Sequence, residues 1–579
     1  MSLSASNPMH HDPQQPRLGM RRQVWVGLLV LGLLLLRFVH LGADTPVLIT
    51  LPDDVGLYVD EGYKTMGPRN LVLFGADNWH PADDYGSWRG ASPLTQWSYY
   101  AAFRGLAPDL QSARVVTVFY FGLFLLAYVW AMGMRLRWPA FVGGLLALGL
   151  ESTLFFYSRV ALFELPLIAF SYGLLFYFAR MESHRVVLPM ALTAAFGAVV
   201  AMTIKVSAVF YVIPIAVAVV IHLLVQTRSG PNRRLVRGVV LGTAVAALIS
   251  FVATYDWIHA AFIQRNIDQS SHPFSTAGTL YRALTMPLMR ASPFAVILGL
   301  AGLAHGLALR PDRYLGSLYR LSLICLVVLT PLIVAVFPYN PLRYYVPALP
   351  AYILLALDWV DSRPWRTAPP GHVPLVRRIG VIALLATAVF SGLFSTYRLF
   401  PDALPAGFRS RTDVVTYLLL PAAAALGALV WASREVLFRR RVLVPGAVSL
   451  LLAFTLYSAY GLMRFLIAPT YQLRALSGKV ARIVGAEATI AGDWAPIAVL
   501  GTPVRALYMN SRFNPVANID GIRPDYFLHG ESKESRRSLS ELLRAPGVRV
   551  GAPIDVGTYY DGQRRMALYP LHYDAPAAR

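Results

Sequence analysis

Two adjacent carboxylates, Asp60 and Glu61, stand in the stretch YVDEGYK at residues 58–64. An acidic pair in a loop outside an apolar run is ordinarily a solvated surface. The functional interpretation makes the two a catalytic pair, in which Asp60 takes the proton from a hydroxyl group as that group attacks. General-base help of this kind contributes about 10²–10⁴ in rate.

A second candidate site is the stretch YSRVALFELPL, which places Arg159 and Glu164 five residues apart at an expected turn. These two side chains either pair with each other and fix the turn, or contact a substrate. Lys205 stands alone between two apolar runs. It is either a snorkelling lysine or a functional cation, because ionisable groups at membrane depth are costly and functional by default.

The fourth candidate is PYNPLRYYVPALP, which contains Arg343 and Tyr344. An aromatic anchor at a membrane surface explains the tyrosines, but it explains the arginine less well. Together the four sites supply carboxylates, cations and hydroxyl groups. That set suits a reaction whose leaving group is a lipid-anchored phosphate, because cations neutralise the departing charge while a carboxylate activates the nucleophile. We therefore expect Asp60, Arg159, Lys205 and Arg343 around one cavity open to lipid and to the outer water.

The composition indicates that these residues belong to a membrane protein, whose transmembrane helices must position them. Of 579 residues 56% are hydrophobic and 14% charged, and the mean hydropathy is +0.51, which excludes an ordinary soluble domain. The net charge of +21 comes mostly from arginines in short segments between apolar runs, which argues against nucleic acid as a partner. The single cysteine, Cys325, excludes a disulfide framework and a cysteine-based metal site.

Apolar runs long enough to cross about 30 Å of hydrocarbon predict roughly thirteen transmembrane helices. They lie near 24–43, 113–134, 138–157, 161–179, 186–204, 206–226, 238–256, 286–309, 317–337, 343–360, 379–397, 414–433 and 442–467. The first run is too long for a cleaved secretion signal and lacks a small-residue cleavage site, so we interpret it as an uncleaved span.

The charges of the connecting segments predict which side each one faces. If the N-terminus is cytoplasmic, the connections after every second span should contain the arginines, and they do, from Arg135 and Arg137 to Arg439, Arg440 and Arg441. The first opposite connection, 44–112, is acidic and is expected outside, folded back over the membrane surface. The chain then divides into a cytoplasmic tail (1–23), a membrane part (24–467) and an extracytoplasmic domain (468–579).

The final part of the chain alternates apolar and polar residues in short pieces. ATIAGDW, IAVLG, RALYMN and DYFLHG have this alternation, and SLSELLR suggests a short helix. The pattern predicts a small α/β domain. In the acidic loop, SPLTQWSYYAAFRGL is aromatic and amphipathic, and we expect it to lie along the membrane surface.

Five stretches, taken in order, resemble the polytopic glycosyltransferases of the GT-C fold that use polyprenyl-phosphate sugars, in the branch of the protein mannosyltransferases and the lipid A aminoarabinose transferase. They are VDEGYK, SPLTQWSYYAAFRGLAPDLQSARVVTVFYFGL, SRVALFELPL, MTIKVS and LRYYVPALP. The resemblance implies a cytoplasmic-membrane enzyme that moves a monosaccharide from a polyprenyl-phosphate donor to an extracytoplasmic acceptor, with inversion at the sugar carbon.

The resemblance also implies roles for particular residues. Asp60 is similar to the family's catalytic carboxylate, and Lys205 and Arg343 resemble the cations near the lipid phosphate, with Tyr344 as a neighbouring donor. Arg114 and Arg159 match motif positions, and Arg159 and Glu164 are expected at the sugar or the outer turn. The family usually has Asp at the position of Glu164, and the aminoarabinose branch has Lys-Pro-Pro where this chain reads Ala91-Ser92-Pro93.

The sequence leaves alternatives open for the cofactor and for the function. Some members of the family bind a divalent metal, and His80, Asp83 and Asp84 offer ligands for one, although a surface loop without a metal explains them as well. A transporter or flippase of lipid-linked sugars would use cations for phosphate too, but would need charges midway through its spans or broken helices in corresponding halves. A non-catalytic relative that binds a partner through its C-terminal domain is the third interpretation.

Overall fold

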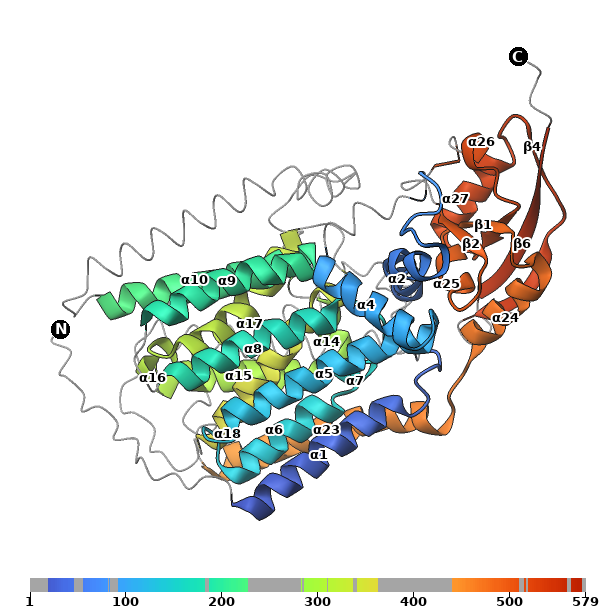
Figure 1. The fold of residues 1–579 in the computed structure, drawn as a ribbon. Coiled ribbons are helices and arrows are strands. Elements are labelled where there is room, and N and C mark those ends of the chain that lie inside the picture. Colours follow the sequence, from blue (N-terminus) through green and yellow to red (C-terminus); the bar gives the residue numbers. More distant parts are fainter. Residues whose placement is uncertain are drawn as a thin grey trace, which may run out of the picture.

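A bundle of long apolar helices fills one part of the molecule, and a mixed α/β unit lies at one end of it (Figure 1). The computed structural model describes residues 19–45, 56–81, 83, 92–182, 187–227, 283, 286–309, 311–336, 341–362, 440–509, 515–516, 519–559 and 564–574. The expected spans near 238–256, 379–397 and 414–433 lie outside these residues.

Helices occupy the other expected spans. They are α1 (Met20–Phe38), α5 (Leu110–Met132), α6 (Trp138–Leu150), α7 (Ser152–Tyr157), α8 (Glu164–Met181), α9 (Val187–Ile204), α10 (Val209–Thr227), α14 (Pro287–Ala291), α15 (Pro293–Leu309), α17 (Leu318–Val336), α18 (Leu349–Asp361) and α23 (Arg440–Ile467). Within the described part, Leu110–Met132, Leu318–Val336 and Val448–Val484 are long and apolar enough to cross a bilayer, and shorter apolar helices accompany them. The number of crossings stays a prediction.

Short elements mark the breaks between these helices. The 3₁₀ turn η2 (Val206–Ala208) separates α9 from α10, and α16 (Pro311–Leu315) precedes α17. Two further 3₁₀ turns, η4 (Leu342–Tyr344) and η5 (Val346–Ala348), lead into α18. These breaks matter because Lys205 stands immediately before η2 and Arg343 lies within η4.

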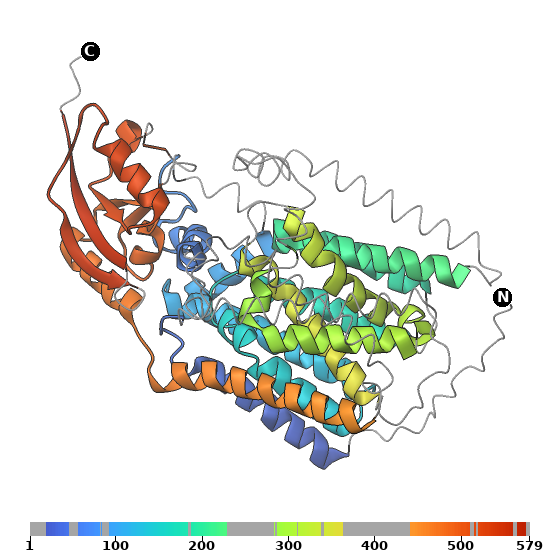
Figure 2. The ribbon, with the colours of Figure 1, turned by 180° about the vertical axis from the view of Figure 1, so that it is seen from behind.

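The described residues of the acidic segment between α1 and α5 include the helices α2 (Gly56–Phe74) and α4 (Pro93–Gly105). The aromatic stretch SPLTQWSYYAAFRGL is helical, with Pro93 in the first turn, where its missing N–H costs nothing. That this helix lies along the membrane surface stays a prediction. Helices α2 and α4 pack on each other, and α2 lies between the bundle and the C-terminal unit (Figures 1 and 2).

The C-terminal unit begins with α24 (Gln472–Val484) and contains the strands β1 (Thr489–Gly492), β2 (Arg505–Tyr508), β3 (Tyr526–His529), β4 (Val548–Val550), β5 (Ile554–Tyr559) and β6 (Arg564–Tyr573). Its six-stranded sheet has the order β2-β1-β3-β6-β4, with β5 on β6. Strands β2, β1 and β3 are parallel. The other pairs are antiparallel.

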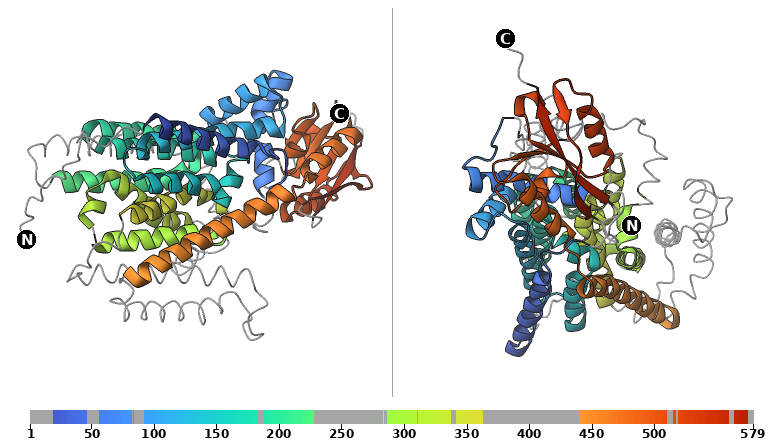
Figure 3. Two further views of the ribbon diagram at one scale, coloured as in Figure 1. Left: turned by 90° about the horizontal axis from the view of Figure 1, so that it is seen from below. Right: turned by 90° about the vertical axis from the view of Figure 1, so that its right-hand side faces the viewer.

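Helices complete this α/β unit. They are α25 (Ala495–Val499), α26 (Ile519–Ile522) and α27 (Lys533–Leu542). Three of the expected alternating pieces are strands, and α27 is the expected short helix. The prediction of a strand at IAVLG is wrong, because this piece contains the end of α25. The run from Ala495 to Leu500 is buried throughout, and burial on all sides makes a short helix as apolar as a strand. Figure 3 shows α23 running along the bundle and leading into this unit.

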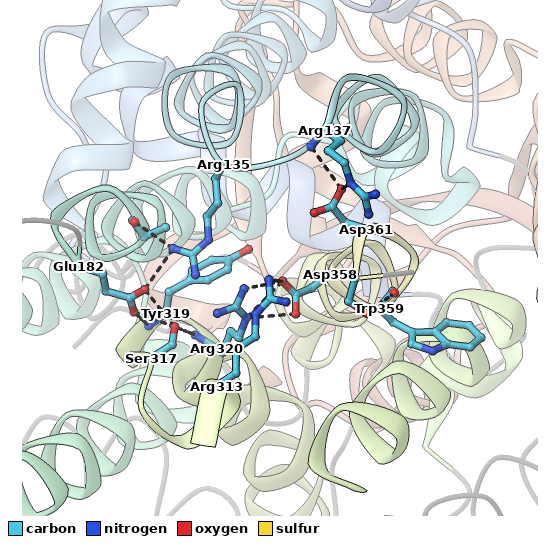
Figure 4. A network of polar contacts seen from close by, with 12 residues as sticks. Arg135, Arg137, Glu182, Arg313, Ser317, Tyr319, Arg320, Asp358, Trp359 and Asp361 are labelled. Atoms are coloured by element: carbon cyan, nitrogen blue, oxygen red, sulfur yellow. Dashed lines mark hydrogen bonds and ion pairs between the residues drawn. The ribbon is translucent and has the colours of Figure 1, made fainter. Parts of the chain in front are cut away.

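Three of the arginines that the sequence places on one side lie in the described residues at the other end of the bundle. Arg135 pairs with Glu182 at 3.1 Å, Arg137 with Asp361 at 3.0 Å, and Arg320 with Asp358 at 2.8 Å. Figure 4 shows these pairs joining α8, α17, α18 and the segment between α5 and α6. The carboxylates come from helix ends and were not foreseen. These arginines therefore link helix ends by ion pairs, in addition to indicating the predicted cytoplasmic side of the bundle.

Candidate active site

The candidate site begins at Asp60, in the second turn of α2. Its Oδ2 forms an ion pair with Arg343 of η4 and lies 3.9 Å from Nζ of Lys64, one turn further along α2. Side chains at i and i+4 share a helix face, so Asp60 and Lys64 point the same way. The Asp60 side chain retains 19% exposure, against 4% for Lys64. The carboxylate is thus fixed in position by cations and still reaches water, so a hydroxyl group can approach it.

The second part of the site is an ion pair between Lys205 and Glu164, of which both side chains are buried. It joins the break after α9 to the first residue of α8. Arg159 instead donates from Nη2 to the carbonyl of His40 at 2.5 Å. The sequence left open a pair between Arg159 and Glu164; the structure gives each a different partner, because α8 begins only at Glu164 and the preceding turn points Arg159 toward the end of α1.

The ring of Tyr344 connects the two parts. The Lys205 ammonium and the Arg343 guanidinium each lie 5.6 Å from its centroid, within the range of a cation–π contact. The Tyr344 backbone carbonyl accepts a hydrogen bond from Tyr211 of α10. Asp60, Lys205, Arg343 and Tyr344 are thus brought to one place, as expected.

Lys64 is the functional candidate that the sequence analysis missed. Besides Asp60 it faces the ring of Phe163 at 5.1 Å, next to Glu164. The signal was present, since the spacing from Asp60 to Lys64 is the helical i, i+4 spacing within the quoted stretch. With Lys64 included, the site has three cations, Lys64, Lys205 and Arg343, against the two carboxylates Asp60 and Glu164. That leaves one net positive charge.

Glu61 has a different environment from its neighbour. Its side chain is fully buried and its carboxylate accepts from Nε and Nη2 of Arg114, both at 2.9 Å, and from the Ala161 amide at 2.6 Å. Arg114 also donates to the carbonyls of Leu41 and Ala43. This bidentate buried pair fastens α2 to α5, which favours a structural role for Glu61.

Arg159 lies apart from the other cations. Its side chain is 4% exposed and its guanidinium lies 4.2 Å from the ring centroid of Phe465. Burial, together with the nearby charge of Arg114, lowers the pKa of Arg159 to about 9. Among the described residues its side chain contacts His40 after α1, Phe155 of α7 and Phe465 of α23, so it does not share the partners of Asp60.

The residues considered for a metal do not assemble into a site within the described part of the chain. Asp83 is buried and its Oδ2 accepts from Asn70 at 3.0 Å and from the Trp79 amide at 3.3 Å. Asp84 lies outside the described residues. Among those that are described, there is no group of three His, Cys, Asp or Glu side chains placed to hold a metal ion. We therefore derive no step that needs one.

Comparison with solved structures identifies the fold. Neither a family model nor a curated protein matches this sequence. Two crystal structures of ArnT from Cupriavidus metallidurans do match, one bound to undecaprenyl phosphate and one in the apo state, with TM-scores of 0.51 and 0.50 and identities of 16% and 15%. Each match covers 94% of this chain and 98% of the other. The chain therefore has the GT-C fold of the ArnT structures over nearly its whole length.

Proposed function

We propose that this chain is a membrane glycosyltransferase that moves a monosaccharide from a polyprenyl-phosphate donor to an extracytoplasmic acceptor. The observation that supports this most is that the carboxylate of Asp60 is held between Lys64 and Arg343. The Lys205 ammonium contacts the ring of Tyr344 beside Arg343. A base beside clustered cations suits attack by a hydroxyl on a carbon that bears a phosphate. The fold agrees, since one matching structure holds undecaprenyl phosphate.

The reaction is a single inverting displacement. The acceptor oxygen forms a bond to the anomeric carbon, and the bond from that carbon to the phosphate oxygen breaks with its electron pair remaining on the phosphate. The acceptor proton moves to a carboxylate oxygen of Asp60. Arg343, Lys205 and Lys64 neutralise the charge that develops on the phosphate, which is where fixed cations contribute most. A second carboxylate acting as nucleophile is not needed.

The remaining predicted residues support this group. Glu164 holds the Lys205 ammonium in place, and Glu61 with Arg114 fixes α2 on α5. We place the enzyme in the cytoplasmic membrane, with the N-terminus inside and residues 468–579 outside, and the apolar helices receive the prenyl chain. The end of the bundle that contains Asp60 then faces outward, and the arginine-rich end of Figure 4 faces the cytoplasm, as the positive-inside rule requires.

Transfer from a panel of radiolabelled polyprenyl-phosphate sugars, with purified protein in detergent, tests this function. We expect one donor to be consumed, and Asp60→Asn to abolish transfer in folded protein. Asp361→Asn, the same change in an ion pair at the other end of the bundle, is the matched control and should retain activity. Full transfer by Asp60→Asn would remove Asp60 from the mechanism. Wild-type protein that consumes no donor, but moves lipid-linked sugar between the leaflets of vesicles, would instead establish the transporter.

A further inference from the structure

Helix α2 lies between the cations of the bundle and the C-terminal unit. Each residue of an α-helix is turned by about 100° from the one before it, so Asp60 and Gly62 project roughly 200° apart, on opposite sides of α2. The Asp60 side meets Arg343. The Gly62 side meets α25, and Figure 2 shows α2 next to the C-terminal unit.

The contact at Gly62 is between backbones. A Cβ atom added to Gly62 would lie 2.3 Å from the amide nitrogen and 2.6 Å from the Cα of Ile497. Because these are main-chain atoms, no side-chain rotation can relieve the overlap. The two helices approach as closely as they do only because residue 62 has no side chain.

Two further contacts join α2 to the C-terminal unit, one at Tyr63, next to Gly62 in the chain, and one at Arg69, on the same side of the helix as Gly62. The rings of Tyr63 and Tyr508 lie 4.5 Å apart between centroids. The buried guanidinium of Arg69 donates from Nη2 to the carbonyls of Thr502 at 2.5 Å and Val504 at 2.6 Å. These partners belong to β2 and to the turn before it, so the C-terminal unit contacts α2 from Gly62 to Arg69, about two turns of the helix.

A proline inside α2 makes these contacts important for the position of the second half of the helix. Pro68 lies inside the helix, where it removes one backbone hydrogen bond and disfavours a straight helix. The bundle holds α2 at Glu61 through Arg114, close to the helix start. The second half of the helix is held at Arg69 by the C-terminal unit.

We propose that the C-terminal domain positions α2, and through it Asp60, for the reaction, with Gly62 and Tyr508 as positioning residues. This rests on the proposed function for its catalytic consequence. Gly62 admits the close approach of α25, and Tyr508 supports the neighbouring residue of α2. Neither residue touches the reacting atoms. The domain is thus a part of the active-site scaffold.

The size of the effect follows from the overlap at Gly62. Ordinary contacts of a Cβ begin at 3.4 Å, whereas the Cβ of an alanine at residue 62 would lie at 2.3 Å. Relief of the overlap needs a shift of α2 by about 1 Å toward the Asp60 side, and a misplacement of that size costs on the order of 10²-fold in rate.

The first test compares Gly62→Ala with Gly478→Ala. Gly478 lies in α24 of the same domain and has no atoms within 4 Å of an added Cβ, so the second variant controls for the substitution itself. We expect Gly62→Ala to lower kcat about 100-fold while donor KM changes only a few-fold, because Lys205 and Arg343 lie on other elements. Unchanged kcat in Gly62→Ala would overturn the proposal.

A second pair of variants avoids changing α2 and does not depend on turnover. Tyr508→Ala removes the ring contact from the domain side, and Tyr508→Phe keeps it. We expect faster amide hydrogen exchange across residues 56–74 in Tyr508→Ala than in wild type, with recovery in Tyr508→Phe and a parallel loss and recovery of kcat. Equal exchange in all three would overturn the proposal even if Gly62→Ala fails to fold. If wild-type protein shows no transfer, the proposed function fails, while the exchange data still decide whether the domain holds α2.

Discussion

In the proposed mechanism, Asp60 and the donor phosphate compete for the guanidinium of Arg343. Without substrate Arg343 pairs with Asp60, and in the proposed mechanism Arg343 pairs with the phosphate. Phosphate binding must therefore weaken or break the Asp60–Arg343 ion pair, which also frees the carboxylate to accept a proton. It follows that Asp60→Asn, although inactive in transfer, should bind a polyprenyl phosphate more tightly than wild type.

The magnitude follows from how buried this pair is. The side chains of Asp60 and Arg343 are 19% and 11% exposed, which lies between two measured regimes. Exposed ion pairs contribute roughly 0.2–1 kcal/mol, and breaking a fully buried pair costs roughly 3–5 kcal/mol. A cost of about 1–2 kcal/mol for giving up the pair corresponds to roughly 5- to 30-fold tighter binding in the variant.

Titration of undecaprenyl phosphate into purified protein in detergent, followed by calorimetry, measures this. Asp361→Asn again provides the control, since it frees Arg137 at the far end of the bundle and should leave the Kd unchanged. Lys205→Gln should weaken binding. If Asp60→Asn binds the lipid phosphate as wild type does, or more weakly, then Asp60 does not compete for Arg343, and this account of the site is wrong.

Three further predictions concern structure. Arg114→Met leaves Glu61 buried without its cation and should lower the free energy of unfolding by about 3–5 kcal/mol, measured by thermal unfolding in detergent; an unchanged midpoint would contradict a structural role for that pair. Asp358→Asn should destabilise the protein similarly by freeing Arg320, without changing kcat, and loss of kcat in folded protein would argue against it. Burial lowers the pKa of His529 in the C-terminal domain, so the unfolded state binds its proton first and the domain should lose stability as pH falls below about 6.5. Protection factors of the β3 amides, which correct for the slower intrinsic exchange at low pH, should be lower at pH 5 than at pH 7 and less pH-dependent in His529→Asn. Equal pH dependence in both proteins would exclude this residue as the cause.

Much of the fold followed from the sequence because long apolar runs have few solutions in a membrane. Helices stand at the expected runs wherever the structure describes them, and Arg135, Arg137 and Arg320, which are expected on one side, meet at one end of the bundle. The stretch IAVLG shows the limit of the approach. Its five residues are apolar without a usable period, and a short buried helix cannot be told from a buried strand by composition alone.

The sequence predicted which residues lie close together better than it predicted which of them form ion pairs. Asp60, Lys205, Arg343 and Tyr344 do meet, since motifs at the same end of neighbouring spans are brought together by the bundle. Lys205 and Glu164 are 41 positions apart, and only the packing of α8 against α9 makes them partners. Arg159 and Glu164 are close in sequence, yet the turn between them directs the two side chains to different neighbours. Sequence proximity is a weak guide to charge pairing outside a helix.

Two of the three cations of the site lie where regular helices stop. Lys205 stands between α9 and η2, and Arg343 lies in the turn η4 ahead of α18. Junctions of this kind accept insertions and exchanges more readily than the packed interior of a bundle. If the proposed function holds, preference for one sugar over another can diverge through changes at these junctions, while the interior proposed to receive the prenyl chain stays unaltered.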